Sequence, residues 1–207
     1  MQIPLTAIAL GLLLLSPQIS AAAQSGQPDS SVVSAIQDLR AAKDSLLRHD
    51  PQTPLKPEAL AQFSGLQYFP IDLDYRLQGA LHIYGRTQQI SVPTNAGTRD
   101  PIERYGRLFF HWQGKPFWLE VYRSAANGEL LIIFTDTTNG HETYSAGRYL
   151  PLEEATNGMY VLDFNIAYNP YCAYNAEFIC PMPPPQNALD FPVRAGERDY
   201  GAELAPQ

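Results

Sequence analysis

The stretch from Tyr105 to Gly140, YGRLFFHWQGKPFWLEVYRSAANGELLIIFTDTTNG, decides the fold class of this 207-residue chain. On either side of Gln113-Gly114, apolar residues recur at every second position, so each run has one apolar face, as a half-buried strand does. Asn127-Gly128 and Asn139-Gly140 separate the runs that follow. Such dipeptides favour the tight turn with two positive φ values, whose twist matches paired strands. The pattern predicts successive β-hairpins.

A fourth turn dipeptide, Asn157-Gly158, extends the pattern to five strand-like runs joined in order. Leu130–Phe134 is apolar on both faces, which is typical of the most buried strand of a sheet. A sheet of this length tends to curl or close, because closure removes exposed edges. We therefore expect a mainly β fold, an antiparallel meander that closes into a small barrel or a strongly curled sheet. The five runs are 105–112, 117–124, 129–136, 142–150 and 159–165.

The N-terminus carries an apolar run, 3–15, that is too short to cross a bilayer, which needs about 20 apolar residues. Ala21 and Ala23 supply small residues as in a signal-peptidase site, although no Lys or Arg precedes the run. We expect a signal peptide at 1–23 and an exported protein, periplasmic or secreted, with no stable membrane anchor after cleavage. An uncleaved anchor is the alternative.

The mature chain, 24–207, is acidic. It contains every charged side chain, and the formal net charge is −7 at pH 7. This balance argues against nucleic acid as a partner, since binding to a phosphate backbone relies on basic patches. The length suits one domain with a sizeable core, and no low-complexity linker divides it. We expect a single β-rich domain.

The residues before the β pattern predict one amphipathic helix, about 30–49. Asp29 or Ser30 can cap it, and Pro51 disfavours its continuation through Asp50. Mixed charges between the apolar positions favour packing on the domain over a membrane-surface or partner-binding role. The apolar residues at helical spacing are Val32, Ile36, Leu39, Ala42, Leu46 and Leu47.

Polar residues in the later runs share faces, so neighbouring strands can gather them at one end of the barrel. Asp136 has the parity of Phe134, and Tyr144 has the parity of Arg148. Arg148 can grip a carboxylate or phosphate in bidentate geometry, which favours a pocket for a small polar or carboxylate-bearing ligand. The alternative is a buried Arg–Asp ion pair that serves the fold, with Tyr144 completing its hydrogen bonds. The candidate ligand-binding residues are Asp136, Tyr144, Arg148, Asp163, Asn165 and Tyr168.

The two cysteines, Cys172 and Cys180, lie in one irregular segment. In an exported protein they favour a disulfide, which would stabilise the fold by about 2–3 kcal/mol for a loop of this size. A reactive Cys172 thiol is the alternative, and it needs a base or a positive charge nearby. The sequence has no His-Glu-x-x-His spacing and no phosphate-binding glycine loop, so we expect no metal and no cofactor.

The segment of about 166–193 is rich in proline. Four prolines, Pro181, Pro183, Pro184 and Pro185, force the chain into an extended conformation. Extended proline segments can bind partner domains, but here the neighbouring cysteines favour a segment that wraps the barrel.

Three motifs mark the second half of the chain. The first, FxDxTxGxxTYxxGRY, spans 134–149, and the second, DFNxAYNPxCAY, spans 163–174. The third, CPxPPxxN, spans 180–187 and is followed by AGE at 195–197. Together with FSGL at 63–66, these motifs resemble the family catalogued as domain of unknown function 1684. The resemblance covers most of the mature chain. It implies a shared fold and brings no catalytic residue to this sequence.

Three functions are compatible with the sequence. The first is a non-catalytic module that binds a small ligand near Arg148. The second is a hydrolase that uses Asp136 or Asp163 as general base, or Cys172 as nucleophile. The third is a structural envelope protein in which the polar cluster serves the fold alone.

Overall fold

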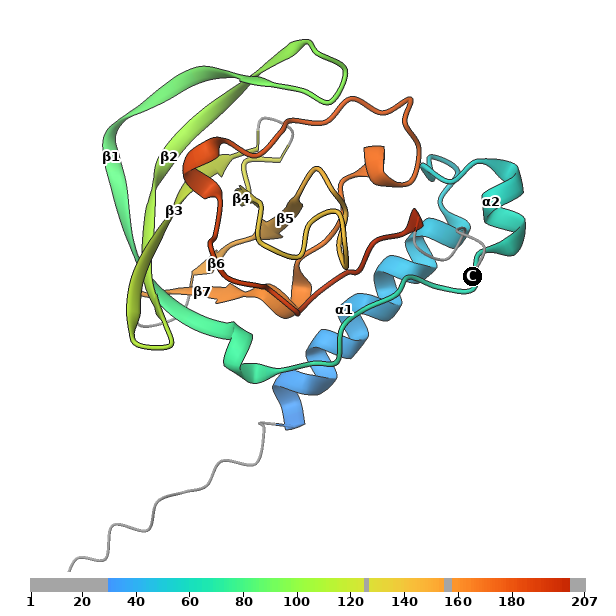
Figure 1. Cartoon of the computed structure of the whole chain (residues 1–207), viewed down its shortest axis with the longest axis horizontal. Coiled ribbons are helices and arrows are strands. Elements are labelled where there is room, and N and C mark those ends of the chain that lie inside the picture. The colour runs from blue at the N-terminus through green and yellow to red at the C-terminus, as the bar shows by residue number, and fades with distance from the viewer. Residues whose placement is uncertain (1–29, 125–126, 155–157, 202–207) are drawn as a thin grey trace, which may run out of the picture.

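The computed structural model describes residues 30–124, 127–154 and 158–201. It shows a curled antiparallel sheet with helix α1 (Ser30–His49) packed beside it and the short helix α2 (Pro57–Gln62) next to the end of α1 (Figure 1). The expected signal peptide lies outside the described residues. Among the described helices, none is long and apolar enough to span a membrane.

Within the described residues, one sheet has the strand order β5-β4-β3-β2-β1-β7-β6. β5 and β6 stand at the two edges of this order, yet Leu152 alone separates them in the chain. The curl therefore brings both edges to one stretch of chain, and the predicted curled, mainly β fold is confirmed. The strands are β1 (Arg76–Pro93), β2 (Arg99–Trp112), β3 (Lys115–Arg123), β4 (Leu130–Phe134), β5 (Arg148–Pro151), β6 (Glu153–Glu154) and β7 (Tyr160–Asp163).

The predicted meander is correct for its first four runs, since β2, β3, β4 and β5 pair in chain order. It is wrong for the fifth run, because β7 pairs with the first residues of β1, from Arg76↔Asp163 to Gly79↔Tyr160. Side-chain periodicity identifies a strand but does not encode its neighbour. Here the curl of the sheet carries the chain after β5 to the free edge of β1.

The turn dipeptides differ in geometry. Gln113 and Gly114 both have positive φ, 48° and 78°, and they close the tight hairpin between β2 and β3. At Asn139-Gly140 the glycine has positive φ, 79°, whereas the asparagine does not. Asn139 instead uses its side-chain oxygen to accept the backbone N–H of Asp136 at 2.6 Å. Residues 135–147 consequently form a loop, and the strand predicted over 142–150 is reduced to β5.

The sheet is apolar on both faces at β4. Ile132 and Phe134 are fully buried on the concave side, in the main core with Leu108 and Leu119. Ile133 points the other way into a second cluster that contains Tyr122. Three of the five residues of β4 are buried, against three of four in β7, so β4 is a buried strand but not the most buried one as predicted.

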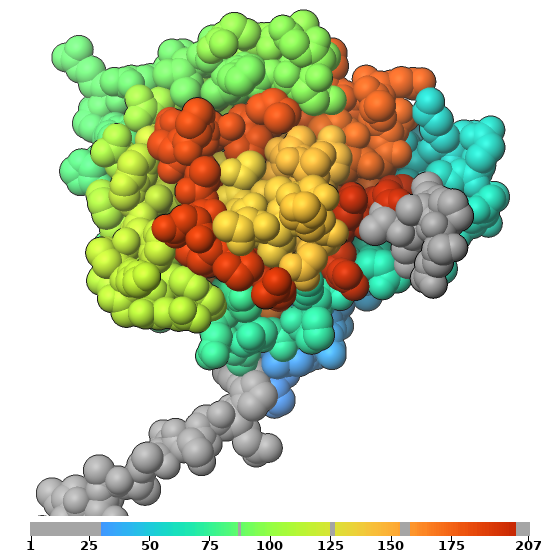
Figure 2. All heavy atoms as spheres, in the orientation of Figure 1, coloured from blue at the N-terminus to red at the C-terminus, as the bar shows by residue number. Residues whose placement is uncertain are grey.

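The C-terminal segment pairs with the chain just after β4. Asn187 and Leu189 exchange backbone hydrogen bonds with Thr135, just after β4. Figure 2 shows loop 135–147 at the centre of one face, bordered by the orange-to-red residues of the C-terminal segment. Long-range backbone pairing thus holds a segment that has little regular structure of its own.

Helix α1 has the predicted bounds and packs on the domain as predicted, but two of its apolar residues remain exposed. Ile36 and Leu47 are buried, whereas Leu39 and Leu46 are 54% and 48% exposed. One apolar flank of α1 is therefore only partly covered by the domain.

Candidate functional site

Arg148 lies inside a closed polar cluster. Its side chain is 0% exposed and forms an ion pair with Asp136, with Nη2 2.9 Å from Oδ2. The guanidinium also donates to three backbone carbonyls of the C-terminal segment, those of Val193 at 2.7 Å, Ala195 at 2.5 Å and Glu197 at 3.2 Å. Burial lowers the pKa of Arg148, and the charge of Asp136 opposes that shift.

Arg148 Nε is buried without a hydrogen-bond partner among the described residues, whereas both oxygens of Asp136 accept hydrogen bonds. Its Oδ1 accepts the backbone N–H and the hydroxyl of Thr138, at 2.9 and 2.6 Å, and the N–H of Val193 at 3.0 Å. The Asp136–Arg148 pair thus ties loop 135–147 and strand β5 to the C-terminal segment. It offers no open face to a ligand, and this geometry is that of the predicted ion pair serving the fold.

Two of the other candidates form a separate cluster. Asp163 pairs with Arg76, Nε to Oδ2 at 3.1 Å, and its Oδ1 accepts from the N–H and the amide of Asn165. Asn165 in turn donates to the carbonyl of Asp72 at 2.8 Å and accepts its N–H at 2.9 Å. These contacts fasten the chain before β1 to the 3-10 turn η2 (Phe164–Ile166). They do not reach Arg148.

The two candidate tyrosines also lie elsewhere. The Tyr144 hydroxyl contacts the sulfur of Cys172 at 3.8 Å, so backbone carbonyls, and not Tyr144, accept the remaining hydrogen bonds that Arg148 makes. Tyr168 pairs through its backbone with Tyr149 and presents its ring to α1. The six predicted site residues are thus distributed over several places, because parity along each strand does not encode which strands meet.

Cys172 and Cys180 are both buried and both free thiols. The N–H of Cys172 donates to the sulfur of Cys180 at 3.3 Å, and the two side chains share a hydrogen bond. The predicted disulfide is therefore not present in this structure, although the two cysteines are close neighbours. No group of three or more potential metal ligands occurs among the described residues.

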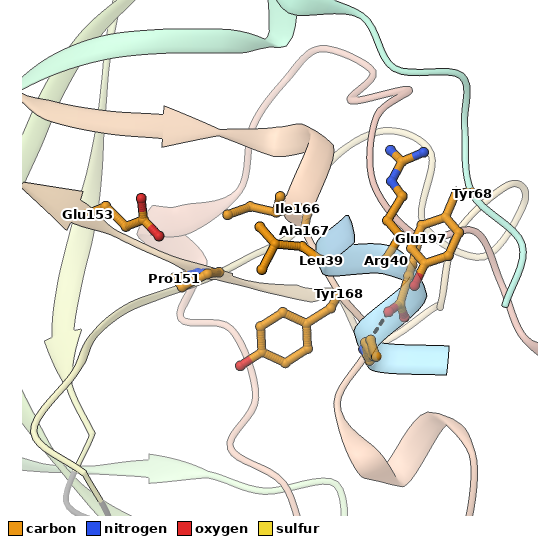
Figure 3. Close-up of a pocket in the computed structure, with 10 residues that line it drawn as sticks. Leu39, Arg40, Tyr68, Pro151, Glu153, Ile166, Ala167, Tyr168 and Glu197 are labelled. Atoms are coloured by element: carbon orange, nitrogen blue, oxygen red, sulfur yellow. Dashed lines mark hydrogen bonds and ion pairs between the residues drawn. The ribbon is translucent and has the colours of Figure 1, made fainter. Parts of the chain in front are cut away.

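An open hollow of about 190 Å³ lies between α1 and the β5–β6 edge (Figure 3). Its wall is mostly apolar. Figure 3 shows Glu153 and Pro151 on one side of the hollow and Arg40, Tyr68 and Glu197 on the other side. Tyr168 lies between the two groups. The lining residues are Leu39, Arg40, Lys43, Tyr68, Pro151, Glu153, Ile166, Ala167, Tyr168 and Glu197.

Lys43 and Glu197 form an ion pair at one end of this hollow. Glu197 is 1% exposed and accepts the Tyr174 hydroxyl at 2.6 Å and the N–H of Asn169 at 2.8 Å. The Lys43 ammonium also lies 4.6 Å from the centre of the Tyr168 ring. Burial lowers the pKa of Lys43, and Glu197 acts against that shift. The charge of Glu197 is thus neutralised within the protein.

Arg40 differs from Lys43, because no described carboxylate forms an ion pair with it. Its guanidinium donates to the carbonyls of Phe69 at 2.9 Å and Asn165 at 3.0 Å and lies 4.6 Å from the Tyr68 ring centre. Arg40 Nε and the Tyr68 hydroxyl are buried and have no hydrogen-bond partner within the described part of the chain. Burial lowers the pKa of Arg40 and raises that of Tyr68. Such unsatisfied groups call for a physical explanation.

Two further hollows continue this site along α1. One, of about 120 Å³, shares Leu39, Glu153 and Ile166 with it and reaches Arg76. The other, of about 410 Å³, shares Lys43 and Tyr168 and extends to Leu46 and Tyr171. We call the three together the α1 groove. The partly covered apolar flank of the helix forms one of its walls.

Residues 61–198 match the model of a family described as protein of unknown function, DUF1684. The chain belongs to this family. An uncharacterised protein of Haloarcula marismortui, with a structure solved by solution NMR, is 32% identical, with a TM-score of 0.66 over 82% of this chain and 95% of that chain. A comparison with curated proteins gives no match. The predicted resemblance to DUF1684 is confirmed.

The DUF1684 match bears on the α1 groove. It includes the lining residues Tyr68, Tyr168 and Glu197, whereas Arg40 and Lys43 of α1 precede it. Sequence reasoning missed Arg40, because a charged residue in an amphipathic helix is normally solvated. The signal that could have found it is its spacing, four residues after Ile36 and seven before Leu47, which places it on the buried flank of α1.

Proposed function

We propose that this DUF1684 protein is a non-catalytic module that binds a small amphipathic carboxylate in the α1 groove. The proposal keeps the ligand class predicted from the sequence and moves the site from Arg148 to Arg40. It rests on one observation: among the described residues, the partly buried guanidinium of Arg40 has no ion-pair partner and the buried hydroxyl of Tyr68 beside it has no hydrogen-bond partner.

The polar end of the groove suits an anionic acceptor. Arg40 and Tyr68 both line the central hollow, and hydrogen bonds from Arg40 Nε and the Tyr68 hydroxyl to a carboxylate would be charge-assisted. An unpaired buried donor is costly, by about 1–3 kcal/mol, so a ligand that satisfies both groups recovers that free energy.

The rest of the groove suits an apolar body. Leu39, Pro151, Ile166 and the Tyr168 ring surround the central hollow, and burial of apolar surface contributes about 25 cal/mol per Å². A concave, mostly apolar site with a few convergent polar groups is the usual form of a small-molecule site. A volume of about 190 Å³ corresponds to about six water molecules, so the central hollow alone fits a small ligand.

A structural role without a ligand is the second candidate, and the closed cluster around Arg148 favours it. A hydrolase has less support, because Asp136 and Asp163 are both engaged in ion pairs with arginine. We also propose that the protein is exported, since its first residues have the pattern of a signal peptide.

A fluorescence titration with anilinonaphthalene sulfonate, an aromatic anion, tests the binding proposal. We expect saturable binding to the native chain and its displacement by decanoate. The variant Leu39→Glu places a negative charge at the mouth of the groove, at a side chain that is 54% exposed. It should weaken binding at least roughly tenfold, which corresponds to about 1.4 kcal/mol.

Ile83→Glu is the matched control, because Ile83 is 48% exposed on β1 and does not line the α1 groove. It should leave the affinity within about twofold, while both variants keep the melting temperature of the parent. Equal affinity for Leu39→Glu and Ile83→Glu would exclude the groove as the binding site. Absence of saturable binding to the parent would favour the structural role.

A further inference from the structure

The segment that contains the two cysteines is hydrogen-bonded to Asn95, in the loop between β1 and β2. Cys180 donates its N–H to the Asn95 side chain at 2.8 Å and accepts the N–H of Asn95 at 3.2 Å. The Asn95 amide also donates to the carbonyl of Phe178 at 3.0 Å. The loop between β1 and β2 thus holds the backbone of Phe178 and Cys180 in place.

The surroundings of Cys172 differ from those of a thiol in an apolar core. Cys172 lies in the 3-10 turn η3 (Tyr171–Ala173), and the hydroxyl of Tyr144 donates to its sulfur at 3.8 Å. The hydrogen bond from Cys180, followed by those from Tyr144 and from backbone N–H groups, lowers the pKa of Cys172 to about 7. The same contact raises the pKa of Cys180. Cys172 is therefore the better nucleophile of the pair.

Access to the pair is limited but not closed. Cys172 and Cys180 retain 6% and 7% exposure, and their neighbours Tyr171 and Ile179 are 41% and 54% exposed. A small oxidant can reach this segment through a local opening, without global unfolding.

We propose that Cys172 and Cys180 are a redox-active dithiol, which a low-molecular-weight disulfide oxidises to an intramolecular disulfide in the folded protein. The proposal rests on the hydrogen bond from the Cys172 N–H to the Cys180 sulfur and on the Asn95 anchor. It does not depend on ligand binding in the α1 groove.

The reaction is a two-step exchange. The Cys172 thiolate attacks one sulfur of the external disulfide, a mixed disulfide forms, and one thiolate leaves and takes up a proton. Cys180 then loses its proton and attacks the sulfur of Cys172, which expels the second thiolate. Two electrons pass from the cysteine pair to the external disulfide, which is reduced to two thiols.

The disulfide would restrain a wall of the α1 groove. Tyr171 and Tyr174 flank Cys172 at either end of η3; Tyr171 lines the outer hollow, and Tyr174 donates to Glu197. The closed loop, 172–180, would limit the unfolded chain and thereby stabilise the fold.

Incubation of the reduced chain with oxidised glutathione, well below the melting temperature, tests this proposal. After an acid quench, mass spectrometry should show the loss of two hydrogens, no bound glutathione and no alkylatable thiol. We expect the melting temperature to rise by roughly 5–10 °C, and reduction with dithiothreitol to reverse the change.

Serine variants assign the roles. Cys180→Ser should accumulate the mixed disulfide with glutathione on Cys172, and Cys172→Ser should react at least roughly tenfold more slowly. Melting curves of both variants establish that they are folded. The proposal fails if both thiols of the parent remain alkylatable after denaturation, or if the two variants take up glutathione at the same rate.

Discussion

Arg148→Met should lower the free energy of unfolding by about 3–5 kcal/mol, because Asp136 would remain buried without its compensating cation. The change would also leave the carbonyls of Val193, Ala195 and Glu197 without their donor. Urea denaturation monitored by tyrosine and tryptophan fluorescence measures the effect.

Arg194→Met is the matched control. Arg194 pairs with Glu142 at 2.9 Å, but its side chain is 56% exposed, so its removal should cost no more than about 1 kcal/mol. The double variant Asp136→Leu with Arg148→Met should be more stable than the sum of the two single changes predicts, since neither charge is left unpaired. An Arg148→Met protein as stable as Arg194→Met would contradict the structural role of the ion pair.

Asn187→Ala should lower the free energy of unfolding by about 3–5 kcal/mol, because three buried backbone groups would lose their partners. Among the described residues, the ladder between β3 and β4 consists of Tyr122↔Leu131 and Arg123↔Leu130 and does not continue to Glu120 and Ile133. The Asn187 side chain bridges the gap. It accepts the N–H of Glu120 at 2.7 Å and donates to the carbonyls of Glu120 at 3.0 Å and Ile133 at 2.9 Å.

Gln186→Ala provides the comparison, since Gln186 is the exposed neighbour of Asn187 in the turn η4 (Pro185–Asn187). Its replacement should change stability by less than about 0.5 kcal/mol. Asn187→Asp should also destabilise the fold, because a carboxylate cannot donate to the two carbonyls and adds a buried charge. Urea midpoints within error for Asn187→Ala and Gln186→Ala would show that the bridge between β3 and β4 is dispensable.

These two predictions concern the fold, whereas the proposed function concerns a different part of the molecule. The motif residues Asp136, Arg148 and Asn187 bind the C-terminal segment to the sheet. The α1 groove lies where α1, η2 and the β5–β6 edge meet, and its unsatisfied groups are Arg40 Nε and the Tyr68 hydroxyl. A dense polar motif in the sequence therefore marked a structural clamp, and the more open site combines the motif residues Tyr168 and Glu197 with Arg40, which belongs to no motif.

Several features could be predicted from local sequence alone. The bounds of α1 follow from apolar spacing and from Pro51, and the hairpin at Gln113-Gly114 follows from its turn dipeptide. The inward direction of Asp136 follows from its parity with Phe134. A buried carboxylate requires a cation nearby, and Arg148 is that cation. Each of these depends on residues a few positions apart, so a short window contains the information.

The tertiary structure alone decided the rest. It placed β7 beside β1, supplied the carbonyls of Val193 and Ala195 to Arg148, and left Leu39 exposed above a hollow. These outcomes depend on how segments more than 40 positions apart approach one another once the sheet curls. Periodicity and turn chemistry describe a chain's nearest neighbours in sequence, whereas a groove is defined by surfaces that long-range packing fails to cover.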